Sequence, residues 1–171
     1  MRWLLRAAVA LAAALVTAAL IGWRLPRSHR ASRELIMPGT AESIWAAITD
    51  VEAFPAWRVD VKRVQRLPDR DGRRAWVEEG RSGKIIFVVE RSDAPRLLVT
   101  RIADPELPFG GTWTYDITPV ARGARLRITE NGEIYNPLFR FMARFIFGYE
   151  GTIASYLTAL ERRVQQRPEG S

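Results

Sequence analysis

The sequence predicts an α+β fold in which a curved antiparallel sheet of about six or seven strands wraps around one long C-terminal helix. Two observations lead to this prediction. Residues 57–134 carry strand patterns separated by short turn signals, which is typical of hairpin-linked antiparallel strands. Residues 137–164 carry one apolar stripe at steps of three and four, which predicts a helix about 40 Å long. Because a sheet that bends around a helix leaves space between the two, we expect a hollow there that could hold a ligand.

Composition excludes several classes of chemistry. The 171 residues contain no cysteine, which rules out disulfides, thiol nucleophiles and thiolate metal sites. The single histidine, His29, makes a histidine-rich metal site unexpected, and we predict neither a metal nor any other cofactor. The net charge is +7, but six arginines precede Glu34, the first acidic residue, and they leave +1 on residues 34–171. The basic excess therefore flanks one segment, and we expect no nucleic-acid partner.

The segment between these arginines predicts a transmembrane helix over residues 1–24. Residues 3–23 would span about 30 Å as a helix, with a Trp at each interface. We expect a single-pass anchor through 3–23 in a bacterial inner (cytoplasmic) membrane. Arginines flank both ends, so the sequence does not fix the side that holds the domain. A cleaved signal peptide, with Thr17-x-Ala19 as its cleavage site, and a buried soluble helix are the alternatives.

Residues 25–31 are predicted to form a short basic linker. His29 falls in this linker, and we interpret it as a solvated residue near lipid headgroups. The folded domain is expected over residues 32–167. Its first element is a short strand over 33–37, ended by a Pro-Gly pair.

Two short helices follow this strand. Thr40 is a good N-cap for a helix over 41–49, whose apolar residues recur at helical spacing. A second short helix is predicted over 51–54, ending before Pro55.

The remaining strands and the terminal helix complete the predicted order. A bulge is expected after Val61, and Asp71-Gly72 marks a hairpin turn. Asn136 as N-cap and Pro137 at the first helical position begin the C-terminal helix. The predicted strands cover 57–67, 74–79, 84–90, 96–102, 111–118 and 124–134.

Four segments resemble the START-like (SRPBCC) superfamily, whose members share the helix-grip fold. The resemblance rests on 41–45 and 49–57, and on 104–113 and 129–137, which are similar to uncharacterised bacterial members. It covers about residues 32–165. The superfamily includes the polyketide cyclase/dehydrase and lipid-transport families and the birch pollen allergen. The resemblance implies an apolar cavity for a lipid, a polyketide or another hydrophobic molecule. It implies no catalytic residues, because the superfamily has no shared catalytic motif.

Strand parity predicts which side chains enter the hollow. Glu78, Arg101 and Glu130 each share parity with apolar neighbours, so two carboxylates and one guanidinium are expected inside. Glu130 would orient the ligand, and the alternatives are a self-satisfied Arg101–Glu130 ion pair or charges at strand ends that lie in solvent. Glu130 and Tyr115 are the candidates for proton transfer. The predicted ligand-binding residues, whose aromatic members could equally be plain core, are Trp57, Trp76, Glu78, Phe87, Arg101, Trp113, Tyr115, Glu130, Phe145 and Tyr149.

The start of the predicted C-terminal helix has more apolar residues than one inward stripe requires. The surplus residues alternate with Arg140 and Arg144, which suggests a turn that lies on the bilayer with its arginines at headgroup level. The alternative is contact with the 41–49 helix and the loop at 105–111. The surplus residues are Phe139, Phe141, Ile146 and Phe147.

Three functions are compatible with these features. We favour membrane-anchored binding of a small hydrophobic molecule, because the sequence offers no nucleophile–base pair for catalysis. An enzyme of the cyclase or dehydratase type, using a cavity Glu or Tyr without a metal or nucleotide, is the second hypothesis. A membrane-tethered scaffold whose cavity is filled by side chains is the third.

Overall fold

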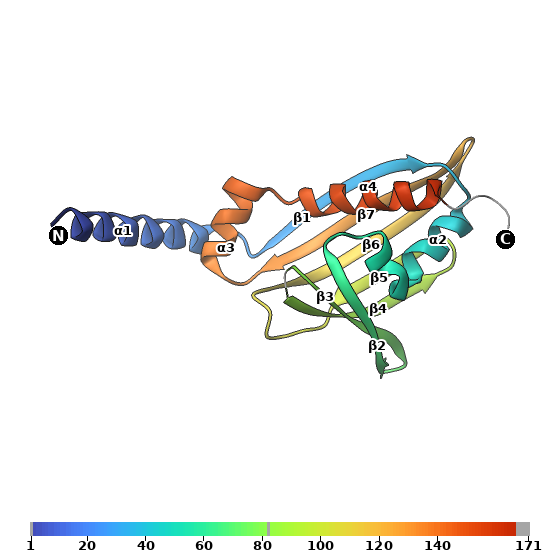
Figure 1. Ribbon diagram of the computed structural model, residues 1–171, viewed down its shortest axis with the longest axis horizontal. Coiled ribbons are helices and arrows are strands. Elements are labelled where there is room, and N and C mark those ends of the chain that lie inside the picture. Colours follow the sequence, from blue (N-terminus) through green and yellow to red (C-terminus); the bar gives the residue numbers. More distant parts are fainter. Residues whose placement is uncertain (1, 82, 167–171) are drawn as a thin grey trace.

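The computed structural model describes residues 2–81 and 83–166, so residue 167, the predicted end of the domain, lies outside the described residues. Its elements follow the predicted order (Figure 1). They are α1 (Arg2–Arg24), β1 (Ser28–Met37), α2 (Ala41–Thr49), the 3₁₀ helix η1 (Val51–Ala56), β2 (Val61–Arg70), β3 (Arg73–Gly80), β4 (Gly83–Asp93), β5 (Leu97–Ile102), β6 (Phe109–Val120), β7 (Gly123–Ile134), α3 (Pro137–Met142), the π-helix η2 (Ala143–Phe147) and α4 (Gly151–Gln165).

Among the described residues, seven strands form one antiparallel sheet in the order β1-β7-β6-β5-β4-β3-β2. Each strand from β2 to β6 pairs with the next along the chain, and β1 completes the sheet by pairing with β7. The sheet curves around α4, which lies along its inner face (Figure 1). The α+β helix-grip architecture is confirmed.

Local sequence signals explain the elements around the first turn of the chain. The Thr40 side chain accepts a hydrogen bond from the backbone N–H of Ser43 at 3.2 Å, so the predicted N-cap of α2 is confirmed. Asp71 and Gly72 have φ of 52° and 71°, the left-handed pair that a tight hairpin turn requires. The register of β2 against β3 shifts between Val61 and Arg63, where the bulge was predicted.

The first strand begins earlier than predicted. β1 starts at Ser28, where it pairs with Glu133, so residues 28–31 are strand and the prediction of a linker up to residue 31 is wrong there. The reason is the length of β7, whose edge extends to Ile134 and offers hydrogen bonds to the basic segment. His29 therefore belongs to the sheet.

The predicted single C-terminal helix is interrupted. α3 ends at Met142, a π-helical turn follows, and α4 begins only at Gly151. Gly148 has φ of 71°, a conformation that ends a helix at little cost for glycine. α4 keeps the predicted stripe, with Ile153, Tyr156, Leu160 and Val164 buried against the sheet.

The core lies between the sheet, α2 and α4. Its fully buried side chains come from all three layers, so α2 and α4 are fixed against the β1–β7–β6 half of the sheet. Burial of such side chains stabilises the fold by about 1.5–3 kcal/mol each. The largest are Met37, Ile44, Leu126, Ile128, Ile153 and Leu160.

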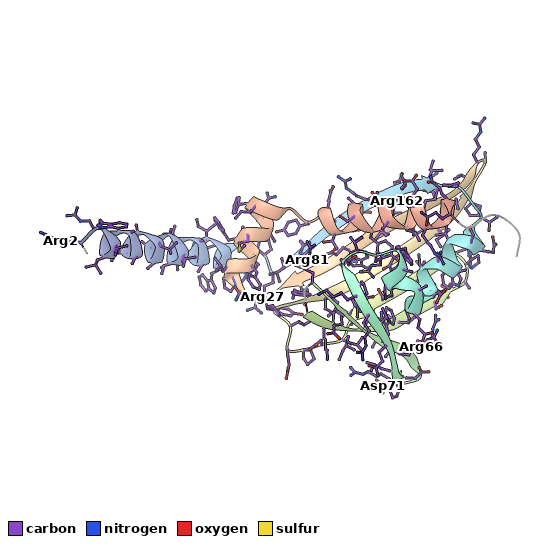
Figure 2. The ribbon with its side chains drawn as sticks, in the orientation of Figure 1. Arg2, Arg27, Arg66, Asp71, Arg81 and Arg162 are labelled. Carbon is purple, nitrogen blue, oxygen red and sulfur yellow. The ribbon has the colours of Figure 1, made fainter. Side chains whose placement is uncertain are left out.

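α1 projects from one end of the domain as an apolar helix (Figure 1). It is long and apolar enough to cross a membrane, a property that a signal sequence shares. Arg2 lies at its free end and Arg27 at its junction with the domain (Figure 2). Gly22 is the one buried residue of α1, and the rest of the helix is not buried. The alternative of a buried soluble helix is therefore wrong.

Candidate functional site

A cavity of about 620 Å³ lies between the curved sheet and the helices that follow β7. Its wall is mostly apolar, with contributions from strands β3 to β6 and from α4. It also reaches the β3–β4 turn at Gly80 and Gly83 and the α3 residues Phe139 and Met142, at the end of the domain where α1 joins. The predicted hollow is therefore confirmed, and it is large enough for a small apolar molecule.

The first polar feature of the cavity wall is the Glu130 cluster, formed by His29, Trp113, Glu130 and Tyr149. Trp113 and Glu130 are direct partners across β6 and β7, and the Trp113 indole N–H donates to Glu130 Oε2 at 2.9 Å. His29 Nε2 lies 3.0 Å from Glu130 Oε1. The His29 ring stacks on Tyr149 with centroids 4.1 Å apart.

A glycine makes room for this cluster. A Cβ at Gly132 would lie 2.3 Å from His29 Cε1 and 2.9 Å from Glu130 Oε1. The absence of a side chain at this position of β7 thus lets the imidazole reach the carboxylate.

The second polar feature is the Arg58 cluster, formed by Arg58, Asp60, Trp76 and Glu78. Arg58 Nη1 lies 3.0 Å from Glu78 Oε2 and Nη2 lies 2.8 Å from Asp60 Oδ2. The Trp76 indole N–H donates to Glu78 Oε1 at 3.0 Å. The guanidinium also lies 5.1 Å from the ring centroid of Phe54, as in a cation–π contact.

Burial sets the protonation of the Arg58 cluster. Burial raises the pKa of Glu78 above its ordinary value, although the Arg58 guanidinium opposes this shift. Burial acts to lower the pKa of Arg58, but the Glu78 and Asp60 carboxylates outweigh it and raise that pKa. Arg58 is therefore a permanent cation held between two carboxylates.

Tyr115 and Tyr156 line the cavity between the two clusters, and both are buried. Burial raises the pKa of each hydroxyl well above the ordinary tyrosine value. Tyr115 is consequently a neutral phenol at physiological pH, able to donate a hydrogen bond but not to act as a base. A raised pKa makes this phenol a weaker acid, so the role of Tyr115 in proton transfer stays a prediction.

Seven of the ten predicted site residues line the cavity. They come from β3, β4, β6, β7 and the turn before α4, and they supply both apolar wall and polar groups. The seven are Trp76, Glu78, Phe87, Trp113, Tyr115, Glu130 and Tyr149.

The other three lie elsewhere. Arg101 points outward and pairs with Glu90, because it is Leu98, Thr100 and Ile102 of β5 that line the cavity. The alternative that predicted an ion pair between Arg101 and Glu130 is therefore wrong. The error arose because both parities of β5 carry apolar residues.

Phe145 and Trp57 fall outside the cavity for different reasons. Phe145 is 60% exposed, because it lies on the π-helical turn before the break at Gly148 and not on a continuous inward stripe. Trp57 packs edge-on against the Tyr156 ring at 5.4 Å and belongs to the core around the cavity.

Two polar residues of the cavity wall, His29 and Arg58, were missed by the sequence prediction. His29 had been assigned to a solvated linker, yet it shares the inward parity of Ala31, Leu35 and Met37 on β1. That alternation was the available signal. Arg58 lies between η1 and β2, where no periodic pattern indicates the direction of a side chain.

α3 packs against α1, so the alternative in which this segment contacts the 41–49 helix is wrong. A Cβ at Gly22 would lie 1.8 Å from the carbonyl oxygen of Pro137. The buried Arg140 donates from Nη1 to the carbonyl oxygen of Leu25 at 2.7 Å. Phe139 and Ile146 remain 45% and 63% exposed beside this contact.

Over residues 2–81 and 83–166, no group of three or more His, Asp or Glu side chains is placed to hold a metal ion.

The fold and cavity define a START-like protein of the SRPBCC superfamily. Residues 28–165 match the model of the polyketide cyclase / dehydrase and lipid transport family. The chain belongs to this family. The match begins at the first residue of β1, in agreement with the observed start of the domain.

Solved structures support the fold. A START superfamily protein from Mycobacterium smegmatis has a TM-score of 0.65 at 21% identity, covering 81% of this chain and 98% of that one. Norcoclaurine synthase from Thalictrum flavum has a TM-score of 0.63 at 12% identity, covering 82% and 88%. The di-domain ARO/CYC StfQ from the steffimycin biosynthetic pathway has a TM-score of 0.65 at 14% identity, covering 82% of this chain. This chain spans about half of StfQ, 51% of its length. A comparison with curated proteins gave no match.

Proposed function

We propose that this protein binds a small hydrophobic molecule, of a lipid, polyketide or similar class, while anchored to a membrane. The single observation that carries the proposal is the cavity of about 620 Å³ with a mostly apolar wall. Transfer of apolar surface from water into such a cavity is favourable at roughly 25 cal/mol per Å². The family's description, which includes lipid transport, agrees with this role.

Matched tryptophan variants test the binding role. Ile102 lines the cavity and Arg101, the preceding residue of β5, points outward. We expect the full-length protein in nonionic detergent to bind the neutral apolar dye N-phenyl-1-naphthylamine saturably, above a detergent-only control. Ile102→Trp should weaken binding by about tenfold or more by filling the cavity, whereas Arg101→Trp should not. Equal dye binding by the two variants would place the dye outside the cavity and contradict the proposal.

The membrane anchor rests on α1. Its 23 residues extend about 34 Å, close to the thickness of a hydrocarbon core. We propose a single pass through residues 3–23 in a bacterial inner membrane. The intact mass of protein purified from bacterial membranes tests this against cleavage after Ala19. A mass that retains residues 1–24 and resistance to carbonate extraction support the anchor, and a shortened soluble product contradicts it.

The contact between α3 and α1 also supports a position of the cavity beside the bilayer. Gly22 lies near the end of α1 that joins the domain, and it packs on Pro137 of α3. We therefore expect the exposed Phe145 and Ile146 to lie close to the membrane surface. The chain has no cysteine, so a single Phe145→Cys substitution gives one site for a spin label. In nanodiscs we expect oxygen to relax this label more strongly than a water-soluble nickel chelate. Val59→Cys, at a 97% exposed position in the η1–β2 connection, should show the opposite preference. If oxygen and the nickel chelate relax the two labels in the same way, the proposal that α3 and η2 lie at the bilayer is contradicted.

The contact between His29 and Glu130 favours a second candidate, proton-transfer catalysis of the cyclase or dehydratase type. A carboxylate 3.0 Å from an imidazole can accept a proton from a carbon next to a carbonyl group and return it to the same carbon. Exchange of the methyl protons of 2-acetylnaphthalene with D₂O, followed by NMR, would detect this step. We expect exchange above the uncatalysed rate that Glu130→Gln abolishes without loss of ligand binding. Exchange at the uncatalysed rate would leave binding as the function.

A further inference from the structure

The half-buried Glu130 differs from the buried Glu78 of the same cavity in having no arginine or lysine side chain paired with it in the described part of the chain. Glu78 faces the Arg58 guanidinium at 3.0 Å. Among the described residues, the groups within hydrogen-bond distance of the Glu130 carboxylate are the Trp113 N–H and His29 Nε2. The indole is neutral, and a neutral imidazole cancels no charge.

This carboxylate lies where a bound molecule would meet it. Glu130, His29 and Trp113 all line the cavity, and the Glu130 side chain keeps 20% of its accessible surface. A carboxylate has about four lone-pair sites, and the two protein contacts leave it able to accept further N–H or O–H bonds. The ring of Tyr149, stacked on His29, adds an aromatic surface, which attracts cations.

A charged ligand would respond strongly to this arrangement. An anionic headgroup in the cavity would lose its hydration and also be repelled by Glu130. An ammonium group would replace its hydration by a charge-assisted hydrogen bond to the same carboxylate. The two Nη atoms of Arg58 are already engaged by Glu78 and Asp60, and Arg81, the other arginine of the cavity wall, lies in the exposed β3–β4 turn.

We propose that Glu130 selects the charge of the ligand. The cavity takes an apolar molecule that carries a hydrogen-bond donor, best an amine, and it rejects carboxylates such as fatty-acid anions. This inference rests on the proposed binding function and deepens it by naming the ligand class.

Three probes with the same ring system test the selection. The probes are 2-naphthylmethylamine, 2-naphthylmethanol and 2-naphthoate, which are cationic, neutral and anionic. Each is titrated calorimetrically into the full-length protein in nonionic detergent at about pH 8, above the ordinary imidazole range, with empty micelles as the blank. We expect the amine to bind at least about tenfold more tightly than the carboxylate, with the alcohol between them.

Two glutamine variants separate the local charge from the overall charge. Glu130→Gln should lower the affinity for 2-naphthylmethylamine by about tenfold and raise the affinity for 2-naphthoate. The affinity for 2-naphthylmethanol should stay within about twofold of the wild-type value. Retained binding of the alcohol shows that this variant is folded. Glu34→Gln makes the same change on the outer face of β1, where Glu34 pairs with Arg127, and should leave all three affinities unchanged.

The outcomes distinguish the inference from the function on which it rests. Equal affinity for all three probes, or equal responses of the two variants, overturns the role of Glu130 and leaves the binding function intact. If the carboxylate binds most tightly, the role of Glu130 is also overturned. If none of the three probes binds, both the proposed binding function and this inference fail.

Discussion

The Arg58 cluster and the Glu130 cluster use the same pair of residue types in different electrostatic settings. In each, a tryptophan N–H donates to a glutamate, from Trp76 to Glu78 and from Trp113 to Glu130. Glu78 is additionally paired with a guanidinium, whereas Glu130 is paired with an imidazole. A buried carboxylate with a permanent cation is satisfied within the protein. We propose that Glu130, which is not paired with a permanent cation, is available to a ligand, so the partner of each glutamate decides whether its cluster is structural or binds a ligand.

Among the variants that test this comparison, we expect the largest effect on stability when the Arg58 cluster is changed. Arg58→Leu removes the cation between Glu78 and Asp60 and leaves Glu78 buried without a counter-charge. We expect the free energy of unfolding, measured with urea on the full-length protein in detergent, to fall by about 3–5 kcal/mol. The double variant Arg58→Leu/Glu78→Leu should recover part of this loss. A single variant as stable as the wild type would show that the pair is not structural.

The next effect concerns pH and Glu78. Because its pKa in the folded protein is raised above the ordinary value of 4.5, the folded state holds this proton to higher pH than the unfolded chain does. The contribution of this proton on Glu78 to the free energy of unfolding is therefore complete at low pH, and it is lost as pH rises through the raised pKa. Urea unfolding over a pH series should show a smaller decline above pH 4.5 in Glu78→Gln than in the wild type. Parallel profiles would contradict the assignment.

A smaller effect on stability is expected at Glu130. Glu130→Gln keeps an acceptor for the Trp113 N–H and removes only the charge, so unfolding should change by about 1 kcal/mol or less. The same urea titration measures it beside Arg58→Leu. A loss as large as that of Arg58→Leu would mean that both clusters are structural.

The smallest expected effect on stability comes from a variant that tests the contact between His29 and Glu130. A methyl group at Gly132 would meet the tip of the His29 ring, which can move aside, so Gly132→Ala should cost less than about 1 kcal/mol. His29 is the single histidine, so its imidazole signals in an NMR spectrum are unambiguous. We expect these signals to shift in Gly132→Ala and in Glu130→Gln alike. Unchanged signals would contradict the contact.

The fold was largely predictable because periodicity and turn chemistry act locally. Thr40, Asp71-Gly72 and Pro137 each set an element boundary by themselves, and the stripe of α4 fixed the face that meets the sheet. The interruption at Gly148 was not predicted, because the apolar residues of α3 and η2 continue the helical spacing, although α3 packs on α1 and Phe145 and Ile146 are exposed.

The candidate site was less predictable, because it depends on pairing between distant strands. Trp113 and Glu130 followed from parity alone. His29 did not, since its direction was set only when β1 extended along the edge of β7. Arg101 was misplaced because β5 has apolar residues on both faces, and Arg58 lies outside any periodic element.

Native mass spectrometry of the full-length protein, extracted from bacterial membranes with detergent, tests the binding cavity most directly. We predict a non-covalent adduct of a small apolar molecule that collisional activation removes, and that is absent from Ile102→Trp but present in Arg101→Trp. A bare protein mass in all three samples, or the same adduct in all three, would contradict a ligand-binding cavity.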